Sequence, residues 1–327
     1  MSREFSRPVI VSSKCIEFDH CRYDGQMIQS ELVRKLKAHA EFRPVCMEAE
    51  IGLGVPRDSL RLVQLPDGRH LMQPATGRDV TREAEEFTTG FLVGQKDVDG
   101  FILKSRSPSC GSRDTKIYPP GDKMTALSSR EAGIFGGMVM ATYPLIAIED
   151  ENRLLNQRLA EHFLTRIFTM ADFRTLKGVG LGALVEFHSD YKFLFMSLNQ
   201  KGMRELGDIV ANHAHIPAPQ VEANYELALL KLLAAPPKCG SEINVMSHLF
   251  GFVSDGLKKD EKDVFTNSLE QYKKGTLAAT VPLQLLKSYV ARFGEPYLKR
   301  QTFLEPFPQE FMDVRNPNDA CVGRDLS

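Results

Sequence analysis

Three cysteines stand where predicted β-strands end. Cys15 follows the first strand, Cys46 closes the second, and Cys110 comes just after the third. Because the carboxyl ends of parallel strands meet at one edge of an open α/β sheet, these thiols are expected to lie together. Reduced thiols grouped in this way suit a thiophilic metal or an iron–sulfur cluster better than a disulfide. The alternative is that each cysteine is a small buried hydrophobic residue, the usual situation of a free cysteine.

A fourth cysteine leaves the number of ligands open. Cys21 is separated from Cys15 by five residues and could join the group. Four thiolates would saturate a cubane cluster and give it a structural or electron-transfer role, whereas three would leave one iron open to a substrate. The sequence has no Cys-x-x-Cys pair, which speaks against zinc-finger geometry.

Polar residues cluster around these cysteines. They are Arg22, Asp24, Glu48, Glu50, Arg57, Ser107 and Ser109. A carboxylate two residues from a metal-bound thiolate, as Glu48 is from Cys46, could act as a general base toward a water molecule. The alternative interpretation makes Glu48 and Arg57 solvent-exposed loop charges, and Asp24-Gly25 a simple turn.

The elements that must position these residues alternate along the first half of the chain. Strands are predicted over residues 8–13, 42–46, 100–105 and 144–148, and helices over residues 26–40, 81–97 and 122–142. Thr81 is the expected N-cap of the second helix, and a loop rich in Gly and Pro precedes it. Strands and helices in alternation predict βαβ units, and therefore an α/β domain with a mostly parallel, Rossmann-like sheet.

The second half carries helical patterns only. Helices are predicted over residues 153–170, 184–212, 222–233, 245–257, 261–274 and 283–293. At 327 residues the chain is about twice the usual domain size, so two domains are expected. The glycine-rich stretch at residues 178–182 is the strongest break, and the boundary is placed near residue 170. We therefore predict an α/β domain over residues 1–170 and an all-α domain over residues 171–327.

The composition narrows the class of protein. Hydrophobic residues make up 43% of the chain and charged residues 25%, which supplies enough apolar surface for packed cores and excludes a disordered chain. The 41 basic residues balance 42 acidic ones, so no positive excess indicates binding to nucleic acid or to a membrane surface. No apolar run approaches the roughly 20 residues that span a bilayer, and the N-terminal apolar stretch is too short for a signal peptide. We expect a cytoplasmic protein whose six cysteines are reduced or bound to metal.

Several ordered motifs resemble the signature blocks of the 2-thiouracil desulfurase (TudS) family over roughly residues 8–165. The motifs are Cys15-x6-Arg22-Tyr-Asp-Gly25, Cys46-Met-Glu48 with Gly-Leu-Gly-Val-Pro-Arg57 after it, Ser105-Arg-Ser-Pro-Ser-Cys-Gly111, and residues 144–154. The second half is similar to a helical domain of YbgA type, of unknown function, over about residues 180–316. Its blocks are residues 188–192, 244–251, 272–275, 281–283 and 297–301.

The resemblance implies a 4Fe–4S cluster held by Cys15, Cys46 and Cys110, with the fourth iron open. It implies that Cys21 is not a ligand, that Glu48 is the catalytic carboxylate and that Ser107 is the catalytic serine. Residues that could line the substrate pocket are Cys21, Arg22, Asp24, Arg57 and Ser109. Two departures stand out: Met47 replaces the usual proline of Cys-Pro-Glu, and the segment after Cys15 places Glu17, Asp19 and His20 near the pocket.

The implied activity is a non-redox, hydrolytic desulfuration of thiolated pyrimidines, which converts thiouracil to uracil and hydrosulfide. The thiocarbonyl sulfur would bind the open iron, and a water molecule activated by Glu48 would attack the carbon. Two alternatives remain. One is a cluster-bearing redox or oxygen sensor in which Cys21 is the fourth ligand and the helical half binds a partner. The other is a helical half that binds nucleic acid through a basic face, so that the substrate is thiolated RNA. It is not favoured, because Glu295 and Glu305 interleave with the basic residues, which are Lys287, Arg292, Lys299 and Arg300.

Overall fold

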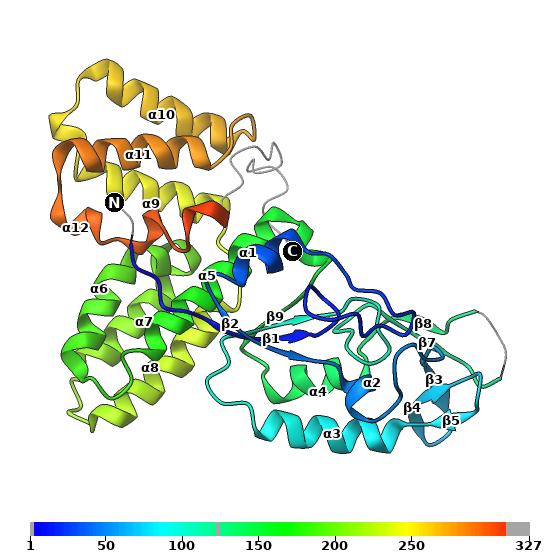
Figure 1. The fold of residues 1–327 in the computed structure, drawn as a ribbon. Coiled ribbons are helices and arrows are strands. Elements are labelled where there is room, and N and C mark those ends of the chain that lie inside the picture. The colour runs from blue at the N-terminus through cyan, green and yellow to red at the C-terminus, as the bar shows by residue number, and fades with distance from the viewer. Residues whose placement is uncertain (1–2, 122–124, 312–327) are drawn as a thin grey trace. The chain divides into compact units, whose positions relative to one another are not determined.

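The computed structural model describes residues 3–121 and 125–311 (Figure 1). The chain folds into two compact units. One unit is Arg7–Phe163, and the other runs from Leu164 onward together with the N-terminal segment up to Ser6. None of the described helices is long and apolar enough to cross a bilayer.

A four-stranded sheet forms the centre of the first unit. Its strands are β1 (Val9–Ser13), β2 (Glu41–Val45), β6 (Gly100–Leu103) and β9 (Ala147–Asp150). The strand order is β2-β1-β6-β9, and every neighbouring pair is parallel, which confirms the predicted α/β fold. The two central strands, β1 and β6, are buried along their whole length, so neither shows the alternation of a half-exposed strand, although β1 ends in the polar residues Ser12 and Ser13.

Helices connect and cover these strands. They are α1 (Glu31–Leu36), the single turn α2 (Met47–Glu50), α3 (Thr81–Val93) and α4 (Ile134–Thr142). In Figure 1, α3 and α4 lie together on one face of the sheet, where Leu92, Phe135 and Val139 share a core with Val11 and Phe101. Two boundaries differ from prediction. Where a helix was predicted over residues 26–40, only the shorter α1 is helical. Thr81, the expected N-cap of α3, is instead the first residue of that helix.

A second sheet was not predicted. Its strands are β3 (Arg61–Leu65), β4 (Gly68–Gln73), β5 (Arg78–Asp79), β7 (Thr115–Tyr118) and β8 (Ser128–Glu131), in the order β5-β4-β3-β7-β8. The segment expected to be a loop forms an antiparallel hairpin of β3 and β4. Its strands are mostly polar and bury few apolar residues, among them Leu62 and Leu71, so their hydrophobic pattern is weak. The Asp67-Gly68 dipeptide is the hairpin signal that could have revealed it.

The helix predicted over residues 122–142 is wrong in its first half. Residues 128–131 form β8, and α4 begins only after Gly133; residues 122–124 lie outside the described residues. The start of α4 lies against the loop that carries Cys110. The amides of Gly133 and Gly136 donate to the carbonyl oxygens of Gly111 (2.8 Å) and Ser109 (3.1 Å). Backbone N–H groups at a helix N-terminus lack partners within the helix, so the loop supplies them.

Close backbone contact makes Gly136 sensitive to substitution. A Cβ there would lie 2.6 Å from the carbonyl oxygen of Cys110 and closer still to that of Gly111. Gly136→Ala is therefore expected to lower the free energy of unfolding by about 1–3 kcal/mol, measured by urea denaturation. Gly137→Ala is the matched control, because its Cβ meets Ala132 Cβ at 3.4 Å and helix propensity favours alanine. Equal stability of the two variants would contradict this prediction.

Helices are the only regular elements among the described residues of the second unit, as predicted. Its helices are α5 (Gln157–Arg174, which begins in the first unit), α6 (Leu181–Leu198), α7 (Gln200–Ala211), α8 (Ala218–Leu233), α9 (Cys239–Gly251), α10 (Lys259–Lys273), α11 (Thr280–Phe293) and α12 (Pro296–Lys299). The helix predicted over residues 184–212 is in fact two. Asn199 leaves the helical conformation (φ −160°) and caps α7 by accepting from the amides of Lys201 (2.9 Å) and Gly202 (3.2 Å).

Candidate active site

The three cysteines at the strand ends line one cavity. Cys15, Cys46 and Cys110 are free thiols, each 9% exposed, and they border a space of about 410 Å³ at the carboxyl edge of the parallel sheet. Cys15 lies in the loop after β1, Cys46 lies in the turn between β2 and α2, and Cys110 lies in the loop after β6. The structure thus brings together three residues that are far apart in sequence.

Cys21 lies among these thiols and is 3% exposed. A hydrogen bond from the Cys15 thiol raises the pKa of Cys21 to about 11, and the contact with Cys21, together with burial, holds the pKa of Cys46 far above its usual range. Burial raises the pKa of Cys110 to about 12. The raised pKa values favour the neutral thiol at Cys21, Cys46 and Cys110, and a bound metal would displace these protons. Outside this group, Cys239 is disulfide-bonded, so the expectation that every cysteine is reduced or metal-bound is wrong there.

Within the described residues, no three side chains of His, Cys, Asp or Glu are arranged to hold a metal ion. The thiols are instead distributed around a cavity that has room for a larger group.

Glu48 is held on both of its carboxylate oxygens. Ser109 Oγ donates to Oε1 at 2.7 Å, and Arg57 Nε donates to Oε2 at 2.7 Å. The same guanidinium donates to the carbonyl oxygens of Gly54 (2.9 Å) and Cys21 (3.0 Å). The Arg57 side chain is 3% exposed and that of Glu48 13%, so the alternative of solvent-exposed loop charges does not describe this pair. The carboxylate has one orientation, at the edge of the cavity.

Ser107 forms the turn that presents Cys110. Its Oγ accepts from the amides of Ser109 (3.2 Å) and Cys110 (3.0 Å), and its carbonyl oxygen accepts from Gly111 N and Thr115 Oγ1, both at 2.9 Å. A hydroxyl oxygen that accepts twice still has its own hydrogen to donate. Ser107 lines the cavity, and its side chain also hydrogen-bonds to the Cys110 thiol.

The remaining predicted pocket residues divide into two groups. Cys21, Arg22 and Arg57 line the cavity, whereas Asp24 and Ser109 are not part of its wall. Asp24 holds the guanidinium of Arg22 through two contacts of 3.1 Å, and Ser109 acts on Glu48 as described above.

The segment after Cys15 places none of its charged side chains in the cavity wall. Glu17, Asp19 and His20 were expected near the pocket, but none of the three is in its wall. Glu17 accepts from Ser30 N at 2.7 Å and pairs with Arg34 at 2.8 Å, so it fixes the start of α1. Asp19 pairs at 2.9 Å with Lys14, which is part of the wall, so this charge lies beside the cavity.

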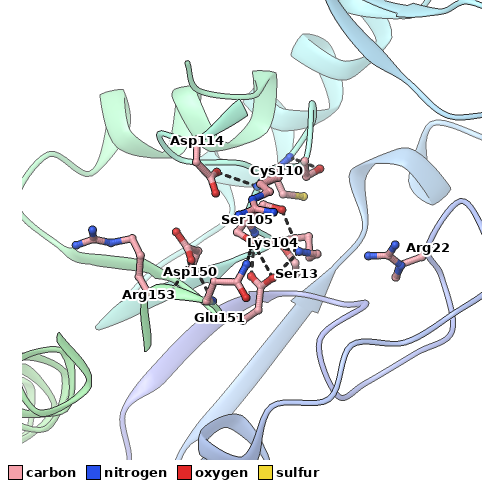
Figure 2. A network of polar contacts seen from close by, with 12 residues as sticks. Ser13, Arg22, Lys104, Ser105, Cys110, Asp114, Asp150, Glu151 and Arg153 are labelled. Atoms are coloured by element: carbon pink, nitrogen blue, oxygen red, sulfur yellow. Dashed lines mark hydrogen bonds and ion pairs between the residues drawn. The ribbon is translucent and has the colours of Figure 1, made fainter. Parts of the chain in front are cut away.

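Sequence reasoning missed a buried polar network beside the cavity (Figure 2). Lys104 forms an ion pair with Glu151 and donates to the Ser105 carbonyl oxygen at 2.9 Å. Ser105 N and Oγ donate to the two oxygens of Glu151 at 2.8 and 2.9 Å, and Lys104 N donates to Ser13 Oγ at 2.9 Å. The network joins the ends of β1, β6 and β9. The signal available was the position of Lys104 directly after the third predicted strand, at the ligand-binding edge.

Comparison with known proteins assigns the two halves of the chain to different families. Residues 9–151 match the model of the 2-thiouracil desulfurase family, and residues 192–308 match a family described as Protein of unknown function (DUF1722). The chain belongs to the 2-thiouracil desulfurase family through its N-terminal half, which confirms the resemblance found in its motifs.

Individual relatives each match part of the chain. The uncharacterized protein YbbK of Bacillus subtilis (strain 168) is 32% identical over 111 residues, which are 32% of this chain and 74% of the relative. The uncharacterized protein YbgA of Escherichia coli (strain K12) is 29% identical over 156 residues, which are 47% of this chain and 92% of the relative. A solved structure, the 4Fe-4S-dependent thiouracil desulfidase TudS, has 27% identity, covers 47% of this chain and 98% of that chain, and has a TM-score of 0.38.

Proposed function

We propose that this protein is a thiouracil desulfurase that removes sulfur from a thiolated pyrimidine by hydrolysis. The observation that supports the proposal is the meeting of three free thiols, Glu48 and Ser107 at one cavity, in a chain of this family. Water supplies the oxygen of the new carbonyl, and the electron pair of the broken carbon–sulfur bond leaves with sulfur as hydrosulfide. The reaction has no net redox change and needs no electron donor.

The cavity suits an iron–sulfur cluster better than a single metal ion. Cys15, Cys46 and Cys110 are soft ligands that border a space of about 410 Å³. We infer that these three cysteines hold a 4Fe–4S cluster, each contributing one thiolate. When bound, the cluster would supply a thiophilic Lewis acid at the iron that has no protein ligand.

Two side chains of this protein would act on the substrate and water. Glu48 takes a proton from the attacking water, and Arg57 and Ser109 keep its carboxylate in one orientation for that transfer. Ser107 donates its hydroxyl hydrogen to the substrate or to the departing sulfur. Arg22 and Arg57 extend the positive side of the cavity wall toward a polar substrate.

The proposal is tested by anaerobic purification with quantitation of iron and sulfide, followed by addition of 2- and 4-thiouracil. We expect about four irons per chain and hydrosulfide released in step with uracil. Heat-denatured protein with the same iron content is the control for release from free iron. A purified protein without iron under anaerobic conditions would contradict the cluster, and iron without turnover would contradict the activity.

A sensor is the second candidate, and one observation favours it. Cys21 is buried among the three proposed ligands and is hydrogen-bonded to two of them, so a fourth thiolate is within the group. A cluster with four protein ligands would have no iron open to a substrate.

The structure gives less support to binding of nucleic acid by the helical unit. Arg292 pairs with Glu261, and Arg300 pairs with Asp190, so these two arginines do not form an unpaired basic surface.

The two candidates differ in their response to Cys21→Ser. For the desulfurase, this variant is expected to keep its iron content and most of its turnover, because three ligands remain. For the sensor, the variant is expected to lose iron or to change its electron paramagnetic resonance spectrum. Iron quantitation and hydrosulfide release, measured together under anaerobic conditions, distinguish them. A Cys21→Ser protein that loses its iron would overturn the three-ligand count.

A further inference from the structure

Ser13 carries a buried hydroxyl that the proposed mechanism does not use. It is the last residue of β1, is 2% exposed and lies in the wall of the cysteine-lined cavity. Its neighbour Ser12 is also buried, but the Ser12 Oγ has no partner within the described residues and Ser12 is not part of the wall. Of the two serines at the end of this strand, Ser13 is therefore the one placed to act on the site.

The oxygen of the Ser13 hydroxyl is held by the neighbouring strand. β1 and β6 pair as far as Ser12 and Ile102, and Lys104 comes directly after the end of β6. The Lys104 amide donates to Ser13 Oγ at 2.9 Å, a contact that Figure 2 includes. The side chain thus serves as the acceptor for an amide at the end of the strand pairing. This contact uses a lone pair of the oxygen and leaves the hydroxyl hydrogen for another acceptor.

The second partner of the Ser13 side chain is the Cys110 thiol. Burial raises the pKa of Cys110, and the hydrogen bond with Ser13 opposes that rise, which is the effect of a donor on a charged sulfur. Ser107 makes a further hydrogen bond to the same thiol. Two hydroxyls, one from the end of β1 and one from the loop after β6, therefore meet at one proposed ligand.

Hydrogen bonds to the sulfur of a ligand have known effects on iron–sulfur clusters. They help to set the reduction potential, and groups that support a ligand in this way also strengthen metal binding. A donor draws electron density from the thiolate, so it stabilises the reduced cluster, which carries the greater negative charge. It also keeps the thiolate in one orientation.

We propose that Ser13 is a positioning residue for the cluster, with its oxygen held by the Lys104 amide and its hydrogen directed to the Cys110 sulfur. This role rests on the proposed function, because it needs the cluster, and it adds a residue that binds neither iron nor substrate. The end of β1 then supports the site in two ways: Cys15 follows it as one ligand, and Ser13 supports another ligand, which comes from the loop after β6.

Anaerobically purified Ser13→Ala tests this role. We expect a more negative midpoint potential in a redox titration followed by electron paramagnetic resonance. We also expect iron binding, measured by competition with a chelator, to weaken roughly 10- to 100-fold. Ser12→Ala is the matched control, because it removes a buried hydroxyl of the same strand that has no partner within the described residues, and it is expected to behave as the wild type. Wild-type potential and iron binding in Ser13→Ala would overturn the proposal.

A second pair of variants separates the hydroxyl from the shape of the side chain. Ser13→Thr keeps the hydroxyl, and Ser13→Val has the shape of threonine without it, so any strain from the larger side chain is common to both. We expect Ser13→Thr to have a less negative potential and tighter iron binding than Ser13→Val. Equal values in these two variants would indicate a structural role alone and contradict the proposal.

These measurements do not depend on turnover, so the two proposals can fail separately. A wild-type protein that binds iron but releases no hydrosulfide would overturn the proposed activity, whereas the comparison of Ser13→Ala with Ser12→Ala would still decide the role of Ser13. An active wild type whose potential and iron binding are unchanged in Ser13→Ala would overturn the role of Ser13 alone. A wild type without iron would overturn both.

Discussion

Glu48→Ala is expected to assemble the cluster and to lose turnover by roughly 10²- to 10⁴-fold, the usual contribution of a general base. The physical reason is that the carboxylate is placed by Arg57 and Ser109 at the edge of the cavity, where it can take a proton from water. None of the three cysteines is removed, so iron binding should persist. The measurement is the rate of hydrosulfide release per cluster, which corrects for differences in loading.

Two further variants sharpen this result. Glu50→Ala changes the exposed carboxylate of the same short helix and is expected to retain turnover. Ser109→Ala removes one of the two groups that orient Glu48 and is expected to give an intermediate loss, with the cluster intact. A fully active Glu48→Ala protein would remove the carboxylate from the mechanism. Equal losses in Glu48→Ala and Glu50→Ala would indicate damage to α2 rather than loss of a base.

Cys110→Ser is expected to abolish stable cluster binding and, with it, all desulfuration. A serine hydroxyl is a harder and far less acidic ligand than a thiol, and iron–sulfur clusters depend on thiolates. Iron content and visible absorbance after anaerobic purification are the measurements. Cys21→Ser is the matched control, because it makes the same atomic change on a buried thiol in the same cavity. A Cys110→Ser protein with a full complement of iron would contradict the proposed ligand set.

The sequence predicts the position of the site better than its details. Strand ends at Cys15, Cys46 and Cys110 were recognisable because short apolar runs alternate with helical patterns, and the topology of a parallel sheet then places the thiols together. Helical periodicity also identified the all-α second half. These features depend on local patterns and on general rules of topology, which a single sequence contains.

Other features depend on contacts between distant residues. The pairing of Glu48 with Arg57 and Ser109 depends on how two loops meet, and no local pattern encodes it. The second sheet was missed because its strands are polar, and β8 was mistaken for helix because the apolar run of α4 follows it closely. Glu17 was placed near the pocket because it is close to Cys15 in sequence, but its carboxylate accepts from Ser30 N and pairs with Arg34 at the start of α1.

The glycines at the start of α4 have a consequence for protein engineering. Gly133 and Gly136 reach neither the thiols nor the cavity wall, yet the main chain of the Cys110 loop rests directly on theirs. The position of Cys110, one of the proposed ligands, thus depends on two residues without side chains, Gly133 and Gly136, about 25 residues further along the chain. A designer who transplants only the cysteines, Glu48 and Ser107 onto another scaffold would omit the helix backbone against which the Cys110 loop packs. The transferable unit is the loop together with the first turn of this helix.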